Sequence, residues 1–412
     1  MRICLLCYRG NPYCGGQGVY LKYVSEELVR QGHDVHAIVG PPYPPDMEGV
    51  TVDCITNNEY FIKKGSSVIS DRNPFSIFHP FNIYEYCNSR LGAFPEISSF
   101  SYRAYLKLRE LMSKKNFDII HDNQCLGYGL LLMKSLGVPV IATIHHPLTI
   151  DLENVLERAT SFVNKMRATM FYPILMQKIV SKRLDHIITV SEDSKMRIHK
   201  SFGVPLERQT VIYNGLDRRI FKPLARVKKI KGKIIFVGNV EDGKKGFPYL
   251  LKAMQWLDNS VHLTIVDGGS PHRRATDRMI RNLGLEKRVL FTGKVDTAEL
   301  VKQYNESEIA LVPSTYEGFG FPAAEAMACG IPVIASNGGA LPEVVGDAGI
   351  VVPARDEYAL AEAIRGLLDK PKLLHALGAA GLKRIEERFN WQGAVEKMIA
   401  VYERCVYYPA IR

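Results

Sequence analysis

Short apolar runs alternate with helix-forming segments along most of this 412-residue chain. Strands and helices that alternate in this way form parallel sheets, because each crossover helix returns the chain to the same edge of the sheet. Seven expected strands lie in the first half of the chain, at 2–8, 34–40, 50–55, 118–121, 139–145, 186–191 and 210–214. Six more lie in the second half, at 233–238, 262–267, 289–293, 309–314, 332–336 and 349–352. The pattern predicts an α/β protein with two doubly wound parallel sheets.

Two such sheets need two hydrophobic cores, and a chain of this length can provide them. We expect a first Rossmann-like domain at 1–215 and a second at 216–390, followed by a C-terminal helix at 391–412. The segment 215–233 carries eight basic residues and a single acid. We interpret it as a solvated connection between the two domains.

The composition is that of a soluble globular protein, with 46% hydrophobic and 23% charged residues. No apolar run reaches the length of about eighteen residues that a transmembrane helix needs. The N-terminal sequence MRICLLCYRG has too short an apolar run for a signal peptide. We therefore expect a cytoplasmic protein.

Eight cysteines are scattered along the chain, and only Cys4 and Cys7 form a C-x-x-C motif. Both fall in the first expected strand, where residues three apart face opposite sides of the sheet and do not share a metal ion. Free thiols in a reducing compartment are the favoured interpretation.

The net charge is +10, from 53 basic and 43 acidic residues. A positive surface suits phosphate-bearing substrates or an anionic membrane. Both halves of the chain are mildly basic and neither carries a separate basic tail, so we expect no nucleic-acid partner.

The stretch 311–343 predicts a strand, a glycine-rich loop and a short helix. Pro322 suits the first position of that helix and Gly330 the residue just past its end. Gly318 and Gly320 let the backbone turn tightly and approach a ligand. The unpaired N–H groups at the start of such a helix form a site for a phosphate or diphosphate.

Two carboxylates flank this loop, Glu317 before it and Glu325 in what we expect to be the first turn of the helix. A carboxylate accepts two hydrogen bonds side by side, which suits the vicinal hydroxyls of a sugar or ribose. A nucleotide sugar offers a diphosphate and diols together. The passage YEGFGFPAAEAMACGIPVIAS, with its two glutamates, closely resembles the signature of the family-4 retaining glycosyltransferases, group 1 enzymes with the GT-B fold.

The resemblance implies roles for the residues of this passage. Glu325 would bind the donor ribose, and Glu317 would contact the donor sugar or its proximal phosphate. The loop Gly318, Phe319, Gly320 and Phe321 would bind the donor, with backbone N–H groups from the last two. The resemblance also implies two Rossmann-like domains that face each other across a cleft, with the C-terminal helix crossing back to the first domain.

The N-terminal glycine-rich segment GNPYCGGQGVYL first suggests a dinucleotide-binding fingerprint. The third glycine of that fingerprint is absent, and the second strand ends without the acidic residue that would hold a ribose, so an NAD-dependent dehydrogenase is disfavoured. By resemblance to family-4 enzymes, Gly15, Gly16 and Gly18 would face the donor diphosphate. Turn glycines without a ligand are the alternative.

Two further positions match the family. His145 follows an expected strand at the edge where α/β sheets bind ligands, and it matches the active-site histidine that contacts the donor sugar. The adjacent His146 can exchange roles with it. In FVGNVEDGKKGF, Gly238 would bind the donor and Lys245 would neutralise the leaving diphosphate. Asn239 stands where the family usually has Arg, which removes one positive charge from this site.

Two segments bear on the acceptor. Residues 57–105 are poorly periodic and contain eleven Phe or Tyr, which we interpret as the packing of an irregular excursion, with an acceptor groove as the alternative. Residues 159–183 carry Lys and Arg, no acid, and many apolar residues, with a break at Pro173. A helix pair packed under the sheet with a basic outer face is the favoured interpretation. An interfacial helix at an anionic membrane, at its inner face, is the alternative.

These observations predict a retaining hexosyltransferase that moves a sugar from a nucleotide-diphosphate sugar to a hydroxyl of a glycan, a lipid-linked acceptor or a small molecule. No Asp-x-Asp motif stands at a strand end, so we expect no metal ion and no cofactor. A non-catalytic nucleotide-sugar binding protein is one alternative. A nucleotide-sugar epimerase or a sugar phosphorylase of the same architecture is the other.

Overall fold

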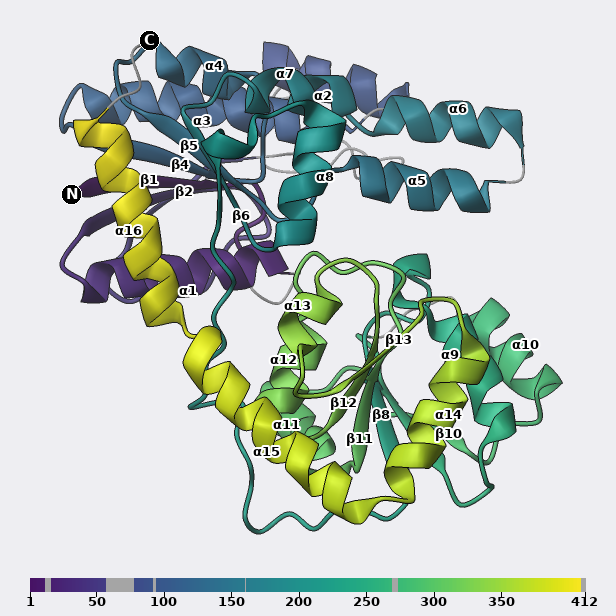
Figure 1. Ribbon diagram of the computed structural model, residues 1–412. Helices are drawn as coiled ribbons and strands as arrows, with labels where there is room; N and C mark the ends of the chain where they lie inside the picture. Colours follow the sequence, from purple (N-terminus) through teal and green to yellow (C-terminus); the bar gives the residue numbers. More distant parts are fainter. Residues whose placement is uncertain (12–15, 57–77, 92–93, 160, 269–272, 409–412) are drawn as a thin grey trace. The chain divides into compact units, whose positions relative to one another are not determined.

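The computed structural model describes residues 1–11, 16–56, 78–91, 94–159, 161–268 and 273–408 (Figure 1). The chain divides into two units. The first comprises Met1–Val190, Ser194–Ile212 and Val395–Arg412, and the second comprises Ser191–Asp193 and Tyr213–Ala394. The domain boundary expected after residue 215 lies close to Tyr213, where the main segment of the second unit begins.

The first unit contains a seven-stranded sheet in the order β3-β2-β1-β4-β5-β6-β7, and every neighbouring pair is parallel. Its strands are β1 (Arg2–Cys7), β2 (Asp34–Val39), β3 (Thr51–Cys54), β4 (Ile119–Asn123), β5 (Val140–Ile144), β6 (His186–Thr189) and β7 (Gln209–Val211). All seven strands expected in this half are confirmed. The strand order reverses direction between β1 and β4, which makes the sheet doubly wound.

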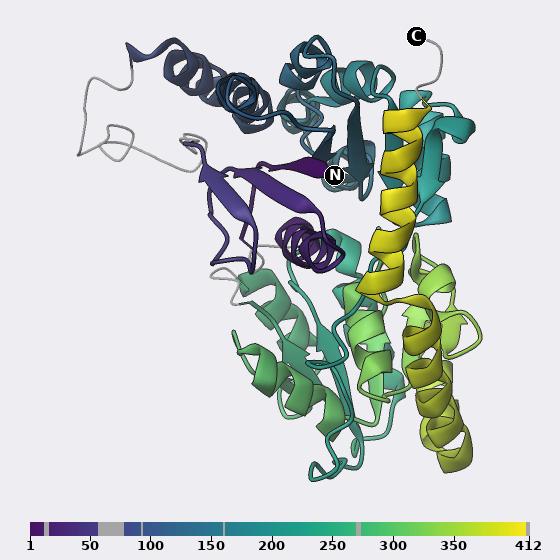
Figure 2. The same ribbon diagram turned by 90° about the vertical axis from the view of Figure 1, so that its left-hand side faces the viewer.

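Helices cover this first sheet on both faces, as Figures 1 and 2 show. The helices of this part of the chain are α1 (Gly16–Arg30), α2 (Pro80–Arg90), α3 (Glu96–Met112), α4 (Gly129–Lys134), α5 (Thr149–Arg158), α6 (Phe162–Phe171), α7 (Ile174–Ser181), α8 (Glu192–Phe202) and α16 (Trp391–Tyr407), with a 3-10 helix at Leu206–Arg208. The prediction of an irregular excursion at 57–105 is wrong for its second part, because helices α2 and α3 carry most of the aromatic residues there. Residues 57–77 lie outside the described residues.

The second unit contains a six-stranded sheet in the order β10-β9-β8-β11-β12-β13, again parallel throughout. Its strands are β8 (Lys233–Val237), β9 (His262–Val266), β10 (Val289–Phe291), β11 (Ile309–Val312), β12 (Val333–Ser336) and β13 (Ile350–Val352). Its helices are α9 (Phe247–Ala253), α10 (Arg274–Asn282), α11 (Thr297–Glu306), α12 (Phe321–Ala328), α13 (Leu341–Val345), α14 (Glu357–Leu368) and α15 (Pro371–Arg388), with 3-10 helices at Gly243–Lys245 and Met254–Trp256.

Most residues of the central strands are apolar because helices bury both faces of the sheet, although β4 (IIHDN) ends in three polar residues. In β5 (VIATI) and β12 (VIAS) every residue is buried. Each unit has its own hydrophobic core between sheet and helices. The prediction of two doubly wound sheets with separate cores is confirmed. Over the described ranges, no helix is both long enough and apolar enough to cross a bilayer.

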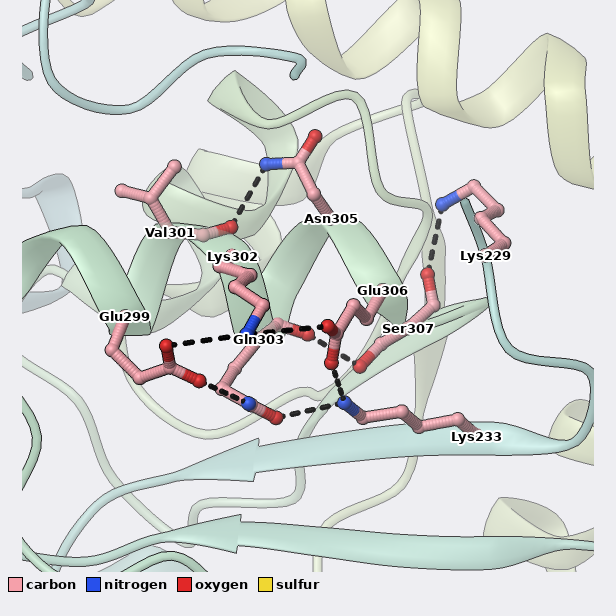
Figure 3. Close-up of polar contacts among 9 residues, drawn as sticks. All are labelled: Lys229, Lys233, Glu299, Val301, Lys302, Gln303, Asn305, Glu306 and Ser307. Carbon is pink, nitrogen blue, oxygen red and sulfur yellow. Dashed lines mark hydrogen bonds and ion pairs between the residues drawn. The ribbon is translucent and has the colours of Figure 1, made fainter. Parts of the chain in front are cut away.

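A polar network fixes the amino-terminal edge of the second sheet (Figure 3). Lys233, the first residue of β8, donates from Nζ to Glu306 Oε2 at 2.6 Å and to Gln303 Oε1 at 2.7 Å. Lys229 donates to the backbone oxygen of Ser307 at 2.8 Å. These bonds join the end of α11 to the start of the central strand. The opposite edge of the sheet, where the strands end, carries the residues that follow.

Candidate functional site

The strand order of the second sheet reverses between β8 and β11. Open α/β sheets bind ligands at such a point, beyond the carboxyl ends of the strands, because the crossover helices there run to opposite faces and leave a crevice. The loops that follow β8, β11 and β12 meet at this edge. They carry most of the residues that the sequence assigns to the donor.

Lys245 and Glu317 form an ion pair at this edge. Lys245 Nζ lies 2.7 Å from Glu317 Oε1, and Ser314 Oγ donates to the same oxygen at 2.8 Å. The lysine side chain is 22% exposed and the glutamate side chain 12% exposed. A cation in this half-buried position is screened less by water than a surface cation. The two residues predicted from separate motifs therefore contact each other.

Backbone packing holds the Lys245 loop against the end of β11. Gly246 has φ +66°, and a Cβ there would lie 1.9 Å from the backbone oxygen of Pro313, so no other residue fits. Thr315 N donates to the backbone oxygen of Lys244 at 2.6 Å. On the other side, Ala340 N donates to the backbone oxygen of Glu317 at 2.9 Å. The loops after β8, β11 and β12 thus form one structure.

The helix after the glycine-rich loop is α12, and Gly320 caps its start with φ +100°. The helix begins at Phe321, so Pro322 is its second residue; the expectation that it is the first was wrong by one position. Gly330 follows the helix with φ +71°, as predicted. The positive end of the helix dipole and the orphan N–H groups of its first turn lie at the ligand edge.

Phe319 contributes its backbone to this edge and its ring to the core. The ring is buried and packs edge-on against Phe389 at 5.6 Å and Phe321 at 5.2 Å between centroids. The buried ring anchors the loop to the core.

Glu325 is the fifth residue of α12, one position past the first turn in which the sequence predicts it, because the helix begins at Phe321. Tyr304 Oη donates to Glu325 Oε2 at 2.9 Å. Burial raises the pKa of the Glu325 carboxyl to about 7, although the tyrosine hydrogen bond and the charge of Lys245 both favour the ionised form. The carboxyl therefore titrates near neutral pH.

Asn239, predicted to bind the donor, lies in the loop after β8. Its side chain is exposed, and its Oδ1 accepts a hydrogen bond from the backbone N–H of Glu241 at 2.9 Å. The amide thus closes its own turn. Gly238, just before it, has φ +152°, and the aliphatic part of Lys245 passes beside it, with Cδ 3.6 Å from where a Cβ would lie. Lys245 is the cation that this loop presents next to Gly238.

In the first unit, His145 directly follows β5, as predicted. Its Nε2 lies 2.8 Å from Asn123 Oδ1, which as an acceptor fixes the tautomer with the proton on Nε2. Burial, and then the neighbouring His146 and His121, lower the pKa of His145 to about 3. The ring is therefore neutral at pH 7. His146 turns to Asp151 instead, at 3.0 Å between Nε2 and Oδ2.

Asn123 also reaches the glycine-rich segment, since its Nδ2 donates to the backbone oxygen of Gln17 at 2.9 Å. Gln17 lies between Gly16 and Gly18. These two glycines belong to the first turn of α1, which begins at Gly16, and are helical rather than part of a loop. Gly15 lies outside the described residues. Asn123 therefore joins the start of α1 to His145.

Sequence reasoning missed the residues at the end of β4. Besides Asn123, Gln124 accepts from the backbone N–H of His145 at 2.6 Å and donates from Nε2 to the His146 oxygen at 3.0 Å. Gln124 has φ +56°, a left-handed conformation that is rare for a non-glycine residue. The signal was present as the polar triplet DNQ, which directly follows the strand expected at 118–121.

A buried chain of hydrogen bonds lies behind His145. Tyr402 Oη is 2.6 Å from His121 Nδ1, whose Nε2 is 2.8 Å from Thr143 Oγ1. The same threonine oxygen lies 2.7 Å from Tyr20 Oη. The Tyr20 ring meets the His145 ring edge-on at 5.0 Å between centroids. Helices α16 and α1 are thereby fixed to the strands that end at the candidate site.

Chemically, the second unit offers a cation, helix amides and two carboxylates at one edge, which suits an anionic ligand with hydroxyl groups. The first unit offers a neutral imidazole with a fixed tautomer. Among the described residues, no group of three or more His, Cys, Asp or Glu is placed to hold a metal ion.

Comparisons with known proteins agree with this description. Residues 14–219 match the sequence profile described as Glycosyltransferase Family 4, and residues 217–384 match that of Glycosyl transferases group 1. The MMP alpha-(1->4)-mannosyltransferase of Mycolicibacterium hassiacum is 36% identical over 420 residues, which covers 98% of each chain.

Solved structures show the same fold. Sucrose-phosphate synthase from Thermosynechococcus elongatus is similar with a TM-score of 0.75 and 23% identity, over 99% of this chain and 100% of the other. HepE from Anabaena, in complex with UDP and glucose, is similar with a TM-score of 0.70 and 18% identity, over 97% and 99%. The two parallel sheets, the profile matches over both units and the full-length relative together place this chain in the group 1 glycosyltransferases of the GT-B fold.

Proposed function

We propose that the protein transfers a hexose from a nucleoside-diphosphate sugar to an acceptor hydroxyl, with retained configuration at the anomeric carbon and without a metal ion or other cofactor. The observation that carries this proposal is the Lys245–Glu317 pair beside Gly238 and the start of α12. When the nucleoside diphosphate leaves, negative charge grows on its outer phosphate. A fixed cation and the amides of a helix N-terminus stabilise that charge without having to reorganise.

In this proposal the ion pair opens when the donor binds. Lys245 Nζ then contacts a diphosphate oxygen in place of Glu317, so its positive charge stabilises the leaving group. Glu317 keeps the hydrogen bond from Ser314 Oγ and gains a hydroxyl of the transferred sugar as a donor. Glu325 accepts hydrogen bonds from the ribose hydroxyls, with Tyr304 holding the carboxyl in place.

The retaining route is proposed from the family to which the chain belongs. Once the ion pair has opened, Glu317 still accepts from Ser314 Oγ and from the sugar hydroxyl, and Glu325 is held by Tyr304 inside α12. These positions favour attack by the acceptor hydroxyl on the same face from which the phosphate departs, and the departing phosphate takes the hydroxyl proton. His145 orients the sugar through its neutral ring.

The donor sugar and acceptor are proposed from the relatives. A relative that is 36% identical over its full length is a mannosyltransferase that forms an alpha-(1->4) linkage, so mannose is the first sugar to test. The HepE structure contains UDP and glucose, so glucose is the second. Glycans, lipid-linked sugars and small molecules all remain within the acceptor class, and a cytoplasmic site of action is part of the proposal.

The proposal is tested by incubating the protein with nucleoside-diphosphate mannose or nucleoside-diphosphate glucose as donor. Each donor is supplied with and without short alpha-(1->4)-linked mannosides as acceptor. We expect free nucleoside diphosphate only when acceptor is present, an unchanged rate in EDTA, and an α-anomeric signal in the NMR spectrum of the product. A new nucleotide sugar formed without acceptor would identify an epimerase. A phosphate-dependent cleavage would identify a phosphorylase, and tight donor binding without turnover on any acceptor would identify a binding protein.

A further inference from the structure

Helix α6 exposes a row of large apolar side chains. Phe162 is 80% exposed, Met166 49% and Met170 52%, and these three lie four residues apart on one face of the helix; Val163 beside them is 50% exposed. Ala168 is the residue of α6 that is buried. Figure 1 shows α6 lying alongside α5 at the margin of the first unit. Contiguous exposed apolar surface of this kind marks an interaction site.

This finding separates two helices that the sequence treats together. The interpretation of 159–183 as a helix pair packed under the sheet holds for α7, where Met176 and Val180 belong to the core. It is wrong for α6, because the chain breaks at Pro173 and the apolar row of α6 faces water. The alternative that the sequence left open therefore becomes the better explanation for α6.

The segment that carries this row is basic, while Glu153 and Glu157 are exposed on the neighbouring α5. From Ala159 to Leu184 the sequence contains no Asp or Glu, and its charged residues are Lys165, Arg167, Lys178, Lys182 and Arg183. Lys165 and Arg167 are exposed on α6 itself. Helix α6 buries little of its own surface and carries an apolar row flanked by cations. This pattern is typical of a helix that lies in a membrane interface.

A cavity of about 1020 Å³ opens beside α6, between its inner side, the end of α5 and the end of α2. Three arginines line it, Arg90, Arg158 and Arg167, and neither Asp nor Glu is among the described residues that line it. Its other lining residues are apolar or amide side chains, including Val155, Phe171, Tyr172, Asn154 and Asn164. Guanidinium groups bind phosphate oxygens in pairs of parallel hydrogen bonds.

We infer that α6 and this cavity form a surface that docks on an anionic phospholipid bilayer. Phe162, Met166 and Met170 enter the boundary between headgroups and acyl chains. Lys165 and the three cavity arginines bind lipid phosphates. A nucleic acid would pair with the cations and leave the apolar row in water. A second copy of the chain would bring like charges together around that row.

This surface does not depend on the proposed chemistry, since none of its residues belongs to the donor site. It would bring the transferase to the membrane face where lipid-linked acceptors lie. Because the two claims rest on different residues, the failure of one is distinguishable from the failure of the other.

The test is co-sedimentation of the full chain with vesicles of phosphatidylcholine alone, or of phosphatidylcholine in which one third is replaced by phosphatidylglycerol. We expect binding to the anionic vesicles to be about tenfold stronger than to the neutral ones and to weaken in high salt. Equal binding to both vesicles, or none to either, would overturn the inference.

Two variants separate the contributions. The triple variant Phe162→Ser, Met166→Ser, Met170→Ser and the triple variant Arg90→Gln, Arg158→Gln, Arg167→Gln should each lose about tenfold in vesicle binding. The control Leu290→Ser with Tyr358→Ser removes exposed apolar side chains of the second unit and should bind as wild type. All variants should keep the wild-type melting temperature and rate on a soluble acceptor. Loss of binding in the control as well, competition by inorganic phosphate alone, or a wild-type dimer that the serine variant dissolves would count against a membrane surface.

Discussion

At the scale of single residues, Glu325 carries the clearest pH dependence. Burial raises its pKa to about 7 in the folded protein, from an unfolded value of 4.5. A carboxyl whose folded pKa is raised contributes stability that is present below pH 4.5 and is lost as the pH rises through 7, because the folded state then has to hold a buried charge.

The variant Glu325→Gln keeps an acceptor for Tyr304 and never ionises. We expect it to melt at the same temperature as wild type at pH 4.5 and at a higher temperature at pH 8, with a difference of at most about 3 kcal/mol in unfolding free energy. The surface variant Glu387→Gln, with a side chain that is 58% exposed in wild type, serves as the control. Identical melting of Glu325→Gln and wild type at both pH values would contradict the raised pKa.

Asn123 is a positioning residue, since it holds His145 Nε2 and the Gln17 backbone oxygen at once. We expect Asn123→Ala to lower kcat about 10- to 100-fold and to leave the KM for the donor nearly unchanged. Asn123→Asp places a negative charge beside His145, which raises the pKa of that imidazole. Its pH–rate profile should therefore fall off at a higher pH than that of wild type on the acid side. An unshifted profile would show that His145 does not act through Asn123; Asn164→Ala, on the exposed helix α6, is the matched control.

At the scale of secondary-structure elements, the sequence predicts what local pattern determines. All thirteen strands are where the alternation of apolar runs placed them, because strands buried on both faces are continuous apolar runs. The predicted first residue of α12, and with it the helical position of Glu325, differ from the structure by one residue. The start of this helix depends on the conformation of a single glycine, Gly320. Helices α2 and α3 were missed, although Ile97, Phe100, Ala104 and Leu108, which are buried on one face of α3, recur at helical spacing.

The network at the start of β8 gives a prediction for the second unit. Lys233, whose side chain is 9% exposed, pairs with Glu306, whose side chain is 17% exposed; Lys302 is 49% exposed and contacts the same carboxylate at 3.8 Å. Removing one partner of a buried pair leaves an uncompensated charge, so Lys233→Ala should cost about 3 kcal/mol in unfolding free energy. Lys302→Ala should cost less than about 0.5 kcal/mol.

Tryptophan fluorescence during urea unfolding measures this difference. The chain has two tryptophans, Trp256 and Trp391, and both lie in the second unit, so the signal reports on the unit that carries the network. Equal midpoints for the two variants would show that the buried pair does not stabilise β8.

At the scale of the whole molecule, contacts distant in sequence were beyond prediction. Tyr402 and His121 are 281 residues apart, and nothing in either segment indicates that the last helix bonds to the fourth strand. The Lys245–Glu317 contact was predicted only as two roles at one ligand, from a family resemblance. Their direct pairing follows from the order of strands β8 and β11 and became visible in the structure.

The central claim is that the second unit binds a nucleoside diphosphate through Lys245 and the amides of α12. Calorimetric titration of wild type, Lys245→Met and the exposed control Lys252→Met with nucleoside di- and monophosphates tests it most directly. The account predicts that Lys245→Met binds the diphosphate about 10- to 100-fold more weakly, while its affinity for the monophosphate changes little and Lys252→Met behaves as wild type. Equal diphosphate affinity of Lys245→Met and wild type would contradict the account.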